Sequence, residues 1–508
     1  MKSLHLVVLG CLGFASLASA TDISGPWNGV YAGLKPVAKD ASVSSQAITA
    51  STSRYLRSAK LVQRVPKETI LLARVLVDLQ ISLKPIKLPD GEILEGLGEP
   101  TQGMDLYSLT YNSTDVTGRP TILSGLAALP AAADGTSVGD ASGGIIAYMH
   151  ATTAQRSNAP SDREMEVYGA VTVFGGENYV IAMPDYLGYG VNRQPHPYAL
   201  GKLNAMAGQD MILAVRELMA AHGRSVGADL FVTGYSEGGG NALWLARALQ
   251  ETGDPSLQPT ATAPMSGPYD MSSATAKSFV AKQPPLTITQ NVMAKPLLMA
   301  FAGVSTAQLT FQPTSGLLKP AFAAQTRGLL PGAQSDSTVA ARLLTSAMPL
   351  GYVTLSADPP HPEKLLQPEL IAAIRTGDTS FPALALWAEN DNTDWRPKTP
   401  VYLLGVIQDP LVTFAGSDYA LPKPYLDEKG LPAPFAQGNA QNTIELMRAK
   451  KFGRLRVGWM GFNGMVSGNV GPQESMTHGD GFIPCAILAA KFFKAKSLAD
   501  MPYLPDPK

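Results

Sequence analysis

The chain has 508 residues, of which 45% are apolar and 16% charged, and its formal net charge is -1. This length is enough for two or three average domains, or for one large domain with an insertion. A nearly neutral chain has no charge excess that would attract nucleic acid or an anionic membrane surface, and a nucleic-acid role is therefore disfavoured.

The first 20 residues have the pattern of a cleavable export signal. Lys2 precedes an apolar run, and the segment closes on Ala18-Ser19-Ala20, the small-residue pattern that a signal peptidase cuts after. The run is shorter than the roughly 20 apolar residues of a membrane-spanning helix. We therefore expect a secreted or periplasmic protein, cut after Ala20. Lipid attachment at Cys11 is the alternative, but Cys11 comes early and Leu9 is bulkier than the residue usually found at that position of a lipoprotein signal.

The chain has two cysteines, Cys11 and Cys485. Once the signal is removed, no internal disulfide can form, so core packing has to stabilise the mature protein. Cys485 lies in an apolar helical run at 483–493. We expect it to be a small buried side chain rather than a nucleophile.

The first elements after the signal are a helix and a hairpin. A helical pattern covers 68–83, within a stretch of mixed signals at 21–100 that we interpret as an N-terminal extension packed on the main domain. Segments 104–113 and 121–130 flank the turn DVTGRP and are rich in β-branched and aromatic residues. They predict a β-hairpin.

Short apolar runs alternate with helical patterns further along the chain. Runs at 143–150 and 178–186 predict strands buried on both faces, and helical patterns follow at 208–223 and 239–251. Alternating strands and helices indicate βαβ units and a mostly parallel sheet, whose functional loops lie at the carboxyl ends of the strands.

One serine lies between two glycines in VTGYSEGGGN, residues 232–241. The strand pattern before it and the helix pattern after it put Ser236 on a strand-to-helix turn, the context that a G-x-S-x-G nucleophile elbow requires. In such a strained turn, a side chain at Gly234 or Gly238 would collide with the neighbouring strand and helix. A plain glycine-rich loop is the alternative interpretation.

A serine nucleophile needs a base, and the base needs a group that orients it. Of the six histidines, only His361 and His478 follow Ser236, as the chain order of such sites requires. His361 lies in a proline-flanked loop. His478 lies between a strand-like segment at 454–462 and an apolar helix, so we predict that it is the base, with a surface-loop histidine as the alternative.

The orienting acid should follow the strand before that of the histidine. Asp409 follows an apolar strand at 401–407 and is our choice, although an aspartate before a proline is also a good turn residue. Other aspartates precede this strand, lie further into the next loop or stand beside His478, where a helix cap explains the residue better. These are Asp391, Asp394, Asp418 and Asp480.

The tetrahedral intermediate formed by a serine nucleophile also needs two backbone N–H donors for its oxyanion. One is expected from Glu237, whose side chain is incidental to that role. The other is expected from the loop YMHATTAQ, at Thr152 or Ala151, while His150 is expected to be structural. The sequence has no HExxH motif and no Cys/His cluster, so we expect no metal and no cofactor.

Five ordered segments resemble a known group: YMHATT, MPDYLGYG, GYSEGG, LWAENDNTDWRPKTPVYLLGVIQDPLV and THGDGFIPCAILAAKFF. Over about residues 100–495 the chain resembles the secreted α/β-hydrolase lipases and esterases of the secretory-lipase (lipase A) type and their bacterial relatives. The resemblance implies an α/β-hydrolase fold with a helical lid and a triad of Ser236, Asp409 and His478. Ala151 departs from the glycine usual in that family, which leaves the second oxyanion donor open, and the mature chain lacks the cysteines of the fungal disulfide.

We expect four parts in the chain: a signal peptide at 1–20, the extension at 21–100, an α/β-hydrolase core at 101–274 and 396–508, and a cap or lid at 275–395. The cap segment is too long for a simple connection and has helical patterns. Its apolar stretches could contact acyl chains or a lipid interface, but such stretches more often form a domain's own core.

The sequence therefore predicts a secreted serine carboxylic-ester hydrolase, a lipase or carboxylesterase, that forms an acyl-enzyme on Ser236. The expected substrate is a small-molecule or lipid ester. Two alternatives stay open, a serine peptidase on the same fold and a non-catalytic binding protein on that scaffold.

Overall fold

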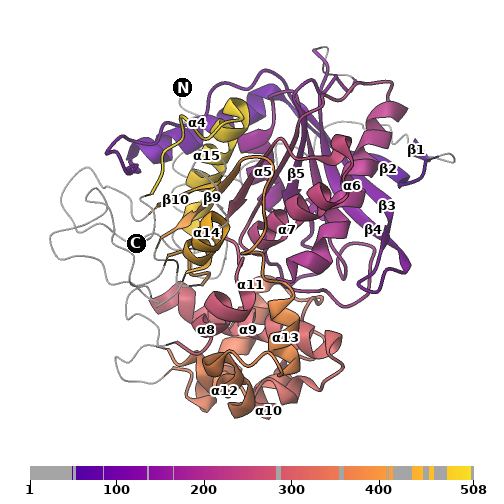
Figure 1. The fold of residues 1–508 in the computed structure, drawn as a ribbon. Helices are drawn as coiled ribbons and strands as arrows, with labels where there is room; N and C mark the ends of the chain where they lie inside the picture. The colour runs from indigo at the N-terminus through magenta and orange to yellow at the C-terminus, as the bar shows by residue number, and fades with distance from the viewer. Residues whose placement is uncertain are drawn as a thin grey trace, which may run out of the picture.

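The structure is a computed structural model, and it describes most of the chain after residue 47. The described residues are 48–49, 53–83, 85–133, 135, 137–163, 165–281, 288–353, 360–407, 409, 411–415, 438–449, 457–462 and 478–504. The predicted signal peptide, Cys11 and Asp418 lie outside these residues. Figure 1 shows a twisted sheet with helices on both sides, and a separate group of helices below it.

Within the described residues, one ten-stranded sheet has the order β1-β2-β3-β4-β6-β5-β7-β8-β9-β10. Strands β6, β5, β7, β8, β9 and β10 are parallel neighbours, whereas β1 to β4 pair in antiparallel fashion, and β4 pairs in the same way with β6. The strands are β1 Ile48–Thr49, β2 Leu56–Val65, β3 Met104–Thr114, β4 Pro120–Pro130, β5 Gly144–Met149, β6 Tyr179–Pro184, β7 Leu230–Tyr235, β8 Ala261–Met265, β9 Val401–Val406 and β10 Val457–Phe462.

Helices cover both faces of this sheet. Helices α6 and α7 pack on one face, and α5 and α15 pack on the other, with α4 outside α5. The helices are α4 Lys67–Leu83, α5 Met165–Phe174, α6 Gly201–Ala221, α7 Glu237–Glu251, α8 Ala276–Ser278, α9 Ile288–Leu309, α10 Pro320–Gln325, α11 Asp336–Ala347, α12 Pro368–Thr376, α13 Pro382–Ala388, α14 Asn439–Ala449 and α15 Phe482–Ala495.

Five of the parallel strands are buried along their whole length. Every residue of β5, β7, β8, β9 and β10 is buried. Because helices exclude water from both faces, these strands have apolar runs instead of alternating polar residues. The predicted α/β class with a mostly parallel sheet flanked by helices is confirmed. So is the predicted hairpin, in which Met104 pairs with Pro130 and Thr114 with Pro120.

The region before residue 100 contributes a strand that the sequence analysis missed. The predicted helix is present as α4, but β2 also pairs along most of its length with β3, from Leu56 opposite Tyr111 to Val65 opposite Met104. Buried and exposed residues roughly alternate along β2. In the sequence LRSAKLVQRV apolar and polar residues alternate only in part, so the sequence signal for this strand is weak. The boundary of the extension at residue 100 stays a prediction.

Helices α8 to α13 form the lower group in Figure 1, called the cap lobe below (residues 276–388). A second hydrophobic cluster fills it, separate from the cluster around the sheet. That second cluster also includes residues from three core loops: Ala154, Tyr198, Ala199, Leu200, Leu411 and Val412. The cap lobe therefore packs directly on core loops, while the exact domain boundaries stay a prediction.

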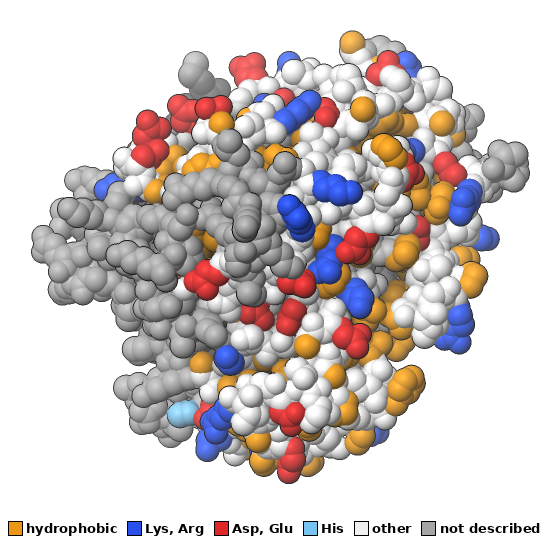
Figure 2. Space-filling view, in the orientation of Figure 1, with side chains coloured by type: hydrophobic (Ala, Val, Ile, Leu, Met, Phe, Trp, Pro, Cys, Tyr) orange, Lys and Arg blue, Asp and Glu red, His pale blue; other side chains and the backbone are white. Residues whose placement is uncertain are grey.

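Basic and acidic side chains are interspersed on the face shown in Figure 2, and neither sign dominates it. This distribution agrees with the formal net charge of -1.

Candidate active site

Ser236 lies on a sharp turn between β7 and α7. Its backbone has φ 58° and ψ -123°, a conformation that non-glycine residues rarely adopt. A Cβ on Gly234 would lie 2.5 Å from the carbonyl oxygen of Gly238, and a Cβ on Gly238 would overlap the carbonyl oxygen of Met149 in β5. Both glycines are therefore required by close backbone approach, and the strand-turn-helix context predicted for Ser236 is present.

The structure brings Ser236, His478 and Asp409 together. His478 Nε2 lies 2.8 Å from Ser236 Oγ, and His478 Nδ1 lies 2.5 Å from Asp409 Oδ2. A carboxylate only accepts hydrogen bonds, so its contact places the imidazole proton on Nδ1. Nε2 is then free to accept the proton of the serine hydroxyl. All three side chains are buried, and Ser236 is 6% exposed.

Backbone contacts hold the acid and the base in place. Asp409 Oδ1 accepts hydrogen bonds from the N–H groups of Leu411 at 2.9 Å and Val412 at 3.0 Å. The Tyr235 hydroxyl, next to the nucleophile in sequence, donates to the carbonyl oxygen of His478. The loop of the base is thereby attached to the strand of the nucleophile, which restricts the relative motion of the two reacting groups.

The N–H groups of the loop after β5 have different partners. Ala151 N–H donates to both carboxylate oxygens of Glu166, at 3.0 and 2.9 Å. Within the described part of the chain, no hydrogen bond from the N–H of Thr152 or of Thr153 is found. As the first residue of α7, Glu237 has an N–H with no partner inside the helix. Thr152 and Glu237 thus have N–H groups available for a ligand, whereas that of Ala151 is occupied.

The side chain of Glu237 has a structural contact that sequence reasoning missed. Its Oε1 lies 2.7 Å from Nε2 of His196 and accepts the N–H of Ala199 at 3.1 Å. The side chains of His196 and Glu237 are both 1% exposed. The carbonyl oxygen of His196 accepts a hydrogen bond from Ser305 in the cap lobe. No local sequence pattern indicates this pair, because His196 lies in a loop and Glu237 begins α7, 41 residues further along the chain.

His150 is buried and stacks on Tyr186, with ring centroids 4.1 Å apart. Burial lowers the pKa of its imidazole, which keeps it neutral near pH 7. Its ring nitrogens lie near the carbonyl oxygens of Ala151 and Asp185. These contacts agree with the structural role expected for His150.

The residues rejected as partners of Ser236 have other contacts. His361 lies 3.2 Å from Glu363 in the cap lobe. Asp391 accepts from the backbone and hydroxyl of Ser272, Asp394 pairs with Arg247, and Asp480 belongs to a short helical turn after His478. Cys485 is buried without a disulfide, and burial raises the pKa of its thiol well above the usual value. A buried thiol with a raised pKa is unreactive, in agreement with the prediction that Cys485 is a buried side chain rather than a nucleophile.

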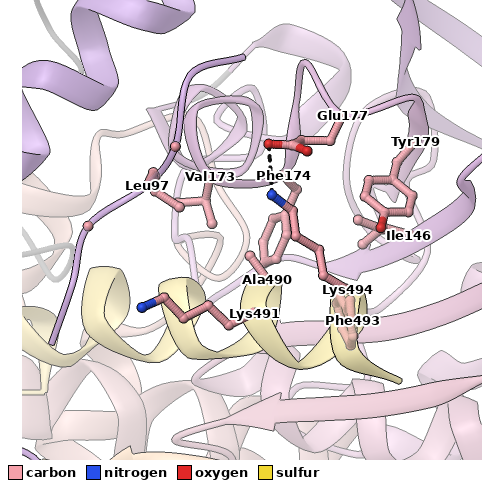
Figure 3. A pocket seen from close by; sticks show the side chains of 12 residues that line it. Leu97, Ile146, Val173, Phe174, Glu177, Tyr179, Ala490, Lys491, Phe493 and Lys494 are labelled. Atoms are coloured by element: carbon pink, nitrogen blue, oxygen red, sulfur yellow. Dashed lines mark ion pairs between the residues drawn. The ribbon is translucent and has the colours of Figure 1, made fainter. Parts of the chain in front are cut away.

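A small cavity lies away from this site, between α5, α15 and the start of β6 (Figure 3). Its volume is about 100 Å³, and Phe174, Tyr179 and Phe493 line it together with an ion pair between Lys494 and Glu177. Tyr179 is the first residue of β6, whereas Ser236 follows the last residue of β7. The cavity therefore opens at the amino ends of the parallel strands and is not the site of Ser236.

Over the residues that the structure describes, no three His, Cys, Asp or Glu side chains are grouped so that they could hold a metal ion. In the same residues, no helix is long and apolar enough to cross a membrane.

No family model and no curated protein sequence matches the chain. Solved structures do. The rice cell wall degrading esterase LipA from Xanthomonas oryzae is 19% identical, with a TM-score of 0.60 over 87% of this chain and 97% of that chain. A hydrolase described as putative from Legionella pneumophila is 20% identical, with a TM-score of 0.62 over 88% and 99%.

Lipase A from Candida antarctica is a more distant match, with 16% identity and a TM-score of 0.48 over 80% of this chain and 81% of that chain. At such low sequence identities the similarity to these structures shows the fold alone. The resemblance stated from the sequence is therefore confirmed for the fold: the chain has the α/β-hydrolase fold.

Proposed function

We propose that the protein is a serine ester hydrolase that forms an acyl-enzyme on Ser236. One observation carries the proposal: His478 lies within hydrogen-bond distance of both Ser236 Oγ and Asp409 Oδ2, at the turn between β7 and α7. A serine hydroxyl is a weak nucleophile until an oriented base can take its proton. The fold supports the proposal, because its solved neighbours include an esterase.

The reaction would proceed in two halves. His478 Nε2 takes the proton of Ser236 as Oγ attacks the ester carbonyl carbon, and Asp409 stabilises the imidazolium. The tetrahedral intermediate collapses, and His478 returns the proton to the leaving alcohol. Water then attacks the acyl-enzyme with His478 again as base, which releases the carboxylic acid and restores Ser236.

The developing oxyanion would accept hydrogen bonds from the N–H groups of Glu237 and Thr152. Glu237 directly follows the nucleophile. We assign the second donor to Thr152 rather than Ala151, because Glu166 already accepts the hydrogen bond of the Ala151 N–H.

A fluorophosphonate probe and a series of p-nitrophenyl esters from two to sixteen carbons test this function. We expect the probe to label Ser236 and at least the short esters to be hydrolysed. A peptide anilide series is the matched comparison, and faster cleavage of the anilides would favour a peptidase instead. Failure of the probe to label Ser236, together with no turnover, would favour a binding protein on this scaffold. Rates with and without an emulsion separate lipase from carboxylesterase behaviour.

Export belongs to the same proposal and rests on residues 1–20 alone. Expression with this segment should give an extracytoplasmic protein whose amino-terminal residue is Thr21. A protein that stays in the cytoplasm with Met1 still attached would contradict it.

A further inference from the structure

Asp336 in the cap lobe reaches the loop that carries the proposed oxyanion donor. Asp336 is the first residue of α11, and its side chain accepts hydrogen bonds from the N–H groups of Ala154 and Gln155, the latter at 2.9 Å. The hydroxyl of Thr153 lies 3.1 Å from both of its carboxylate oxygens. One carboxylate thus holds three consecutive residues of this loop. Hydrogen bonds to a charged acceptor are roughly twice as strong as neutral ones.

The loop is held on its other side by a second carboxylate. Glu166, in α5 of the core, accepts the N–H of Ala151 with both oxygens. Between the two carboxylates lie Thr152 and Thr153, whose N–H groups have no partner among the described residues. The two acids therefore occupy the N–H groups on either side, and the two N–H groups between them keep no acceptor within the described part of the chain.

The backbone of the cap lobe adds to this attachment. Gly332 donates its N–H to the carbonyl oxygen of Ala154 at 2.8 Å, and Arg156 donates its N–H to the carbonyl oxygen of Gly332 at 2.8 Å. Residues Gln155 and Gly332 thereby form a short parallel bridge. The contact between the cap lobe and the loop is therefore an ordered strand-like pairing, with Asp336 at its end.

We propose that Asp336 is a positioning residue for ester hydrolysis. From the cap lobe, its carboxylate holds the core loop so that the Thr152 N–H lies at the oxyanion position. The inference rests on the proposed function. It assigns the cap lobe a part in transition-state stabilisation. An N–H donor that is displaced by a fraction of an ångström stabilises the oxyanion much less, because a preorganised donor acts through its fixed geometry.

The test is the variant Asp336→Ala, with Asp378→Ala as its matched control. Asp378 also lies in the cap lobe and accepts local hydrogen bonds from Ser380, and among the described residues it has no hydrogen bond to the core loop. For p-nitrophenyl butyrate we expect kcat of Asp336→Ala to fall about 10- to 100-fold while KM changes about twofold or less. Asp378→Ala should keep the wild-type kcat.

A second readout separates positioning from simple loss of stability. A trifluoromethyl ketone forms a hemiketal oxyanion on the serine, so its inhibition constant reports on the oxyanion donors. It should rise in Asp336→Ala by the same factor as kcat/KM falls, at a temperature where thermal unfolding shows a folded protein. If Asp336→Ala does not fold, Asp336→Asn decides, since it keeps one acceptor oxygen and should lose about 3- to 10-fold in kcat/KM.

The outcomes are distinct. A wild-type protein that hydrolyses esters, with unchanged kcat and ketone affinity in folded Asp336→Ala or Asp336→Asn, overturns the role of Asp336 alone. A wild-type protein with no ester turnover and no labelling of Ser236 overturns the proposed function, and the inference falls with it.

Discussion

The nucleophile turn and the loop after β5 are held by different means. Ser236 keeps its positive φ because β5 and α7 approach so closely that only glycine fits at positions 234 and 238. The loop at 151–155 contains no glycine, and hydrogen bonds hold it, including the backbone bridge to Gly332. Two carboxylates, Glu166 from the core and Asp336 from the cap lobe, hold it through hydrogen bonds. The first region is fixed by steric exclusion and the second by charge-assisted contacts.

This difference predicts how each region tolerates change. Steric constraints fail when atoms are added, since a packed interior has no room for them. Charge-assisted contacts fail when an acceptor is removed, since the N–H donors lose their partner. Substitutions of each kind therefore test whether the two regions differ as described.

The largest expected effect is on turnover in Ser236→Ala. This variant should lose about 10⁶-fold in kcat because it removes the nucleophile of the acyl-enzyme. Its melting temperature should stay near that of the wild type. The matched control is Ser266→Ala, since Ser266 directly follows the neighbouring strand β8 with a similar φ of 46°. Equal losses in the two variants would show that the region, and not the hydroxyl of Ser236, matters.

Asp409→Asn should have the next largest effect. It leaves the shape of the acid intact but permits the wrong imidazole tautomer, so kcat should fall about 10⁴-fold. Burst and steady-state kinetics with p-nitrophenyl acetate measure this loss. Asp394→Asn is the control, because that exposed aspartate was a competing candidate and pairs with Arg247. A large loss in Asp394→Asn with little change in Asp409→Asn would reverse the assignment of the acid.

Gly238→Ala tests the steric constraint directly. The added methyl group overlaps the carbonyl oxygen of Met149, so we expect destabilisation by about 3 kcal/mol and loss of the serine geometry. Thermal unfolding and fluorophosphonate labelling measure the two effects. Gly316→Ala in the cap lobe is the control, because its Cβ would meet only Pro313 Cγ, at 3.8 Å. Equal stability of the two variants would contradict the steric account.

Glu166→Gln gives the smallest expected effect and concerns pH. Burial raises the pKa of Glu166 to about 7, with the Tyr148 hydroxyl and the Ala151 N–H opposing that rise. The folded state thus binds this proton more tightly than the unfolded chain. The stabilisation is complete below the ordinary pKa of Glu, near 4.5, and is lost as the pH rises through about 7.

Glutamine has no such titration, so the melting temperature of Glu166→Gln relative to wild type should increase from pH 4 to pH 8. The difference in unfolding free energy should reach about 1 to 3 kcal/mol. Burial also raises the pKa of Asp105, Asp185, Asp210 and Asp391 to about 6, and these groups remain in both proteins. A pH-independent difference between the two proteins would contradict the burial of an ionisable Glu166.

Much of the fold and the three central site residues could be predicted from the sequence. The strands around 143–150, 178–186 and 401–407 have apolar runs because both their faces are buried. Ser236 was identified from a pattern that spans only a strand end, five residues and a helix start. Asp409 and His478 could then be identified, because the chain order and the positions of the strand ends leave few candidates for the acid and the base. The structure brings the three side chains into contact, while their catalytic roles stay a prediction.

Other parts could not be predicted. Strand β2 could not be predicted because apolar and polar residues alternate only in part along it, within a stretch of mixed composition. The choice between Ala151 and Thr152 depended on Glu166, since the loop sequence alone does not show which N–H is already occupied. Asp336 begins an ordinary amphipathic helix, and nothing near it in the sequence indicates that it contacts Ala154.

The sequence by itself determined what depends on short-range geometry. Periodicity along each segment, glycines at a strained turn and the order of serine, acid and histidine are properties of neighbouring residues or of chain order. Tertiary structure alone decided which distant groups meet: Glu237 with His196, Ala151 with Glu166, and the loop at 153–155 with Asp336. Polar contacts of this kind depend on where folded segments are placed in space, and many surface aspartates and glutamates look the same until that placement is known.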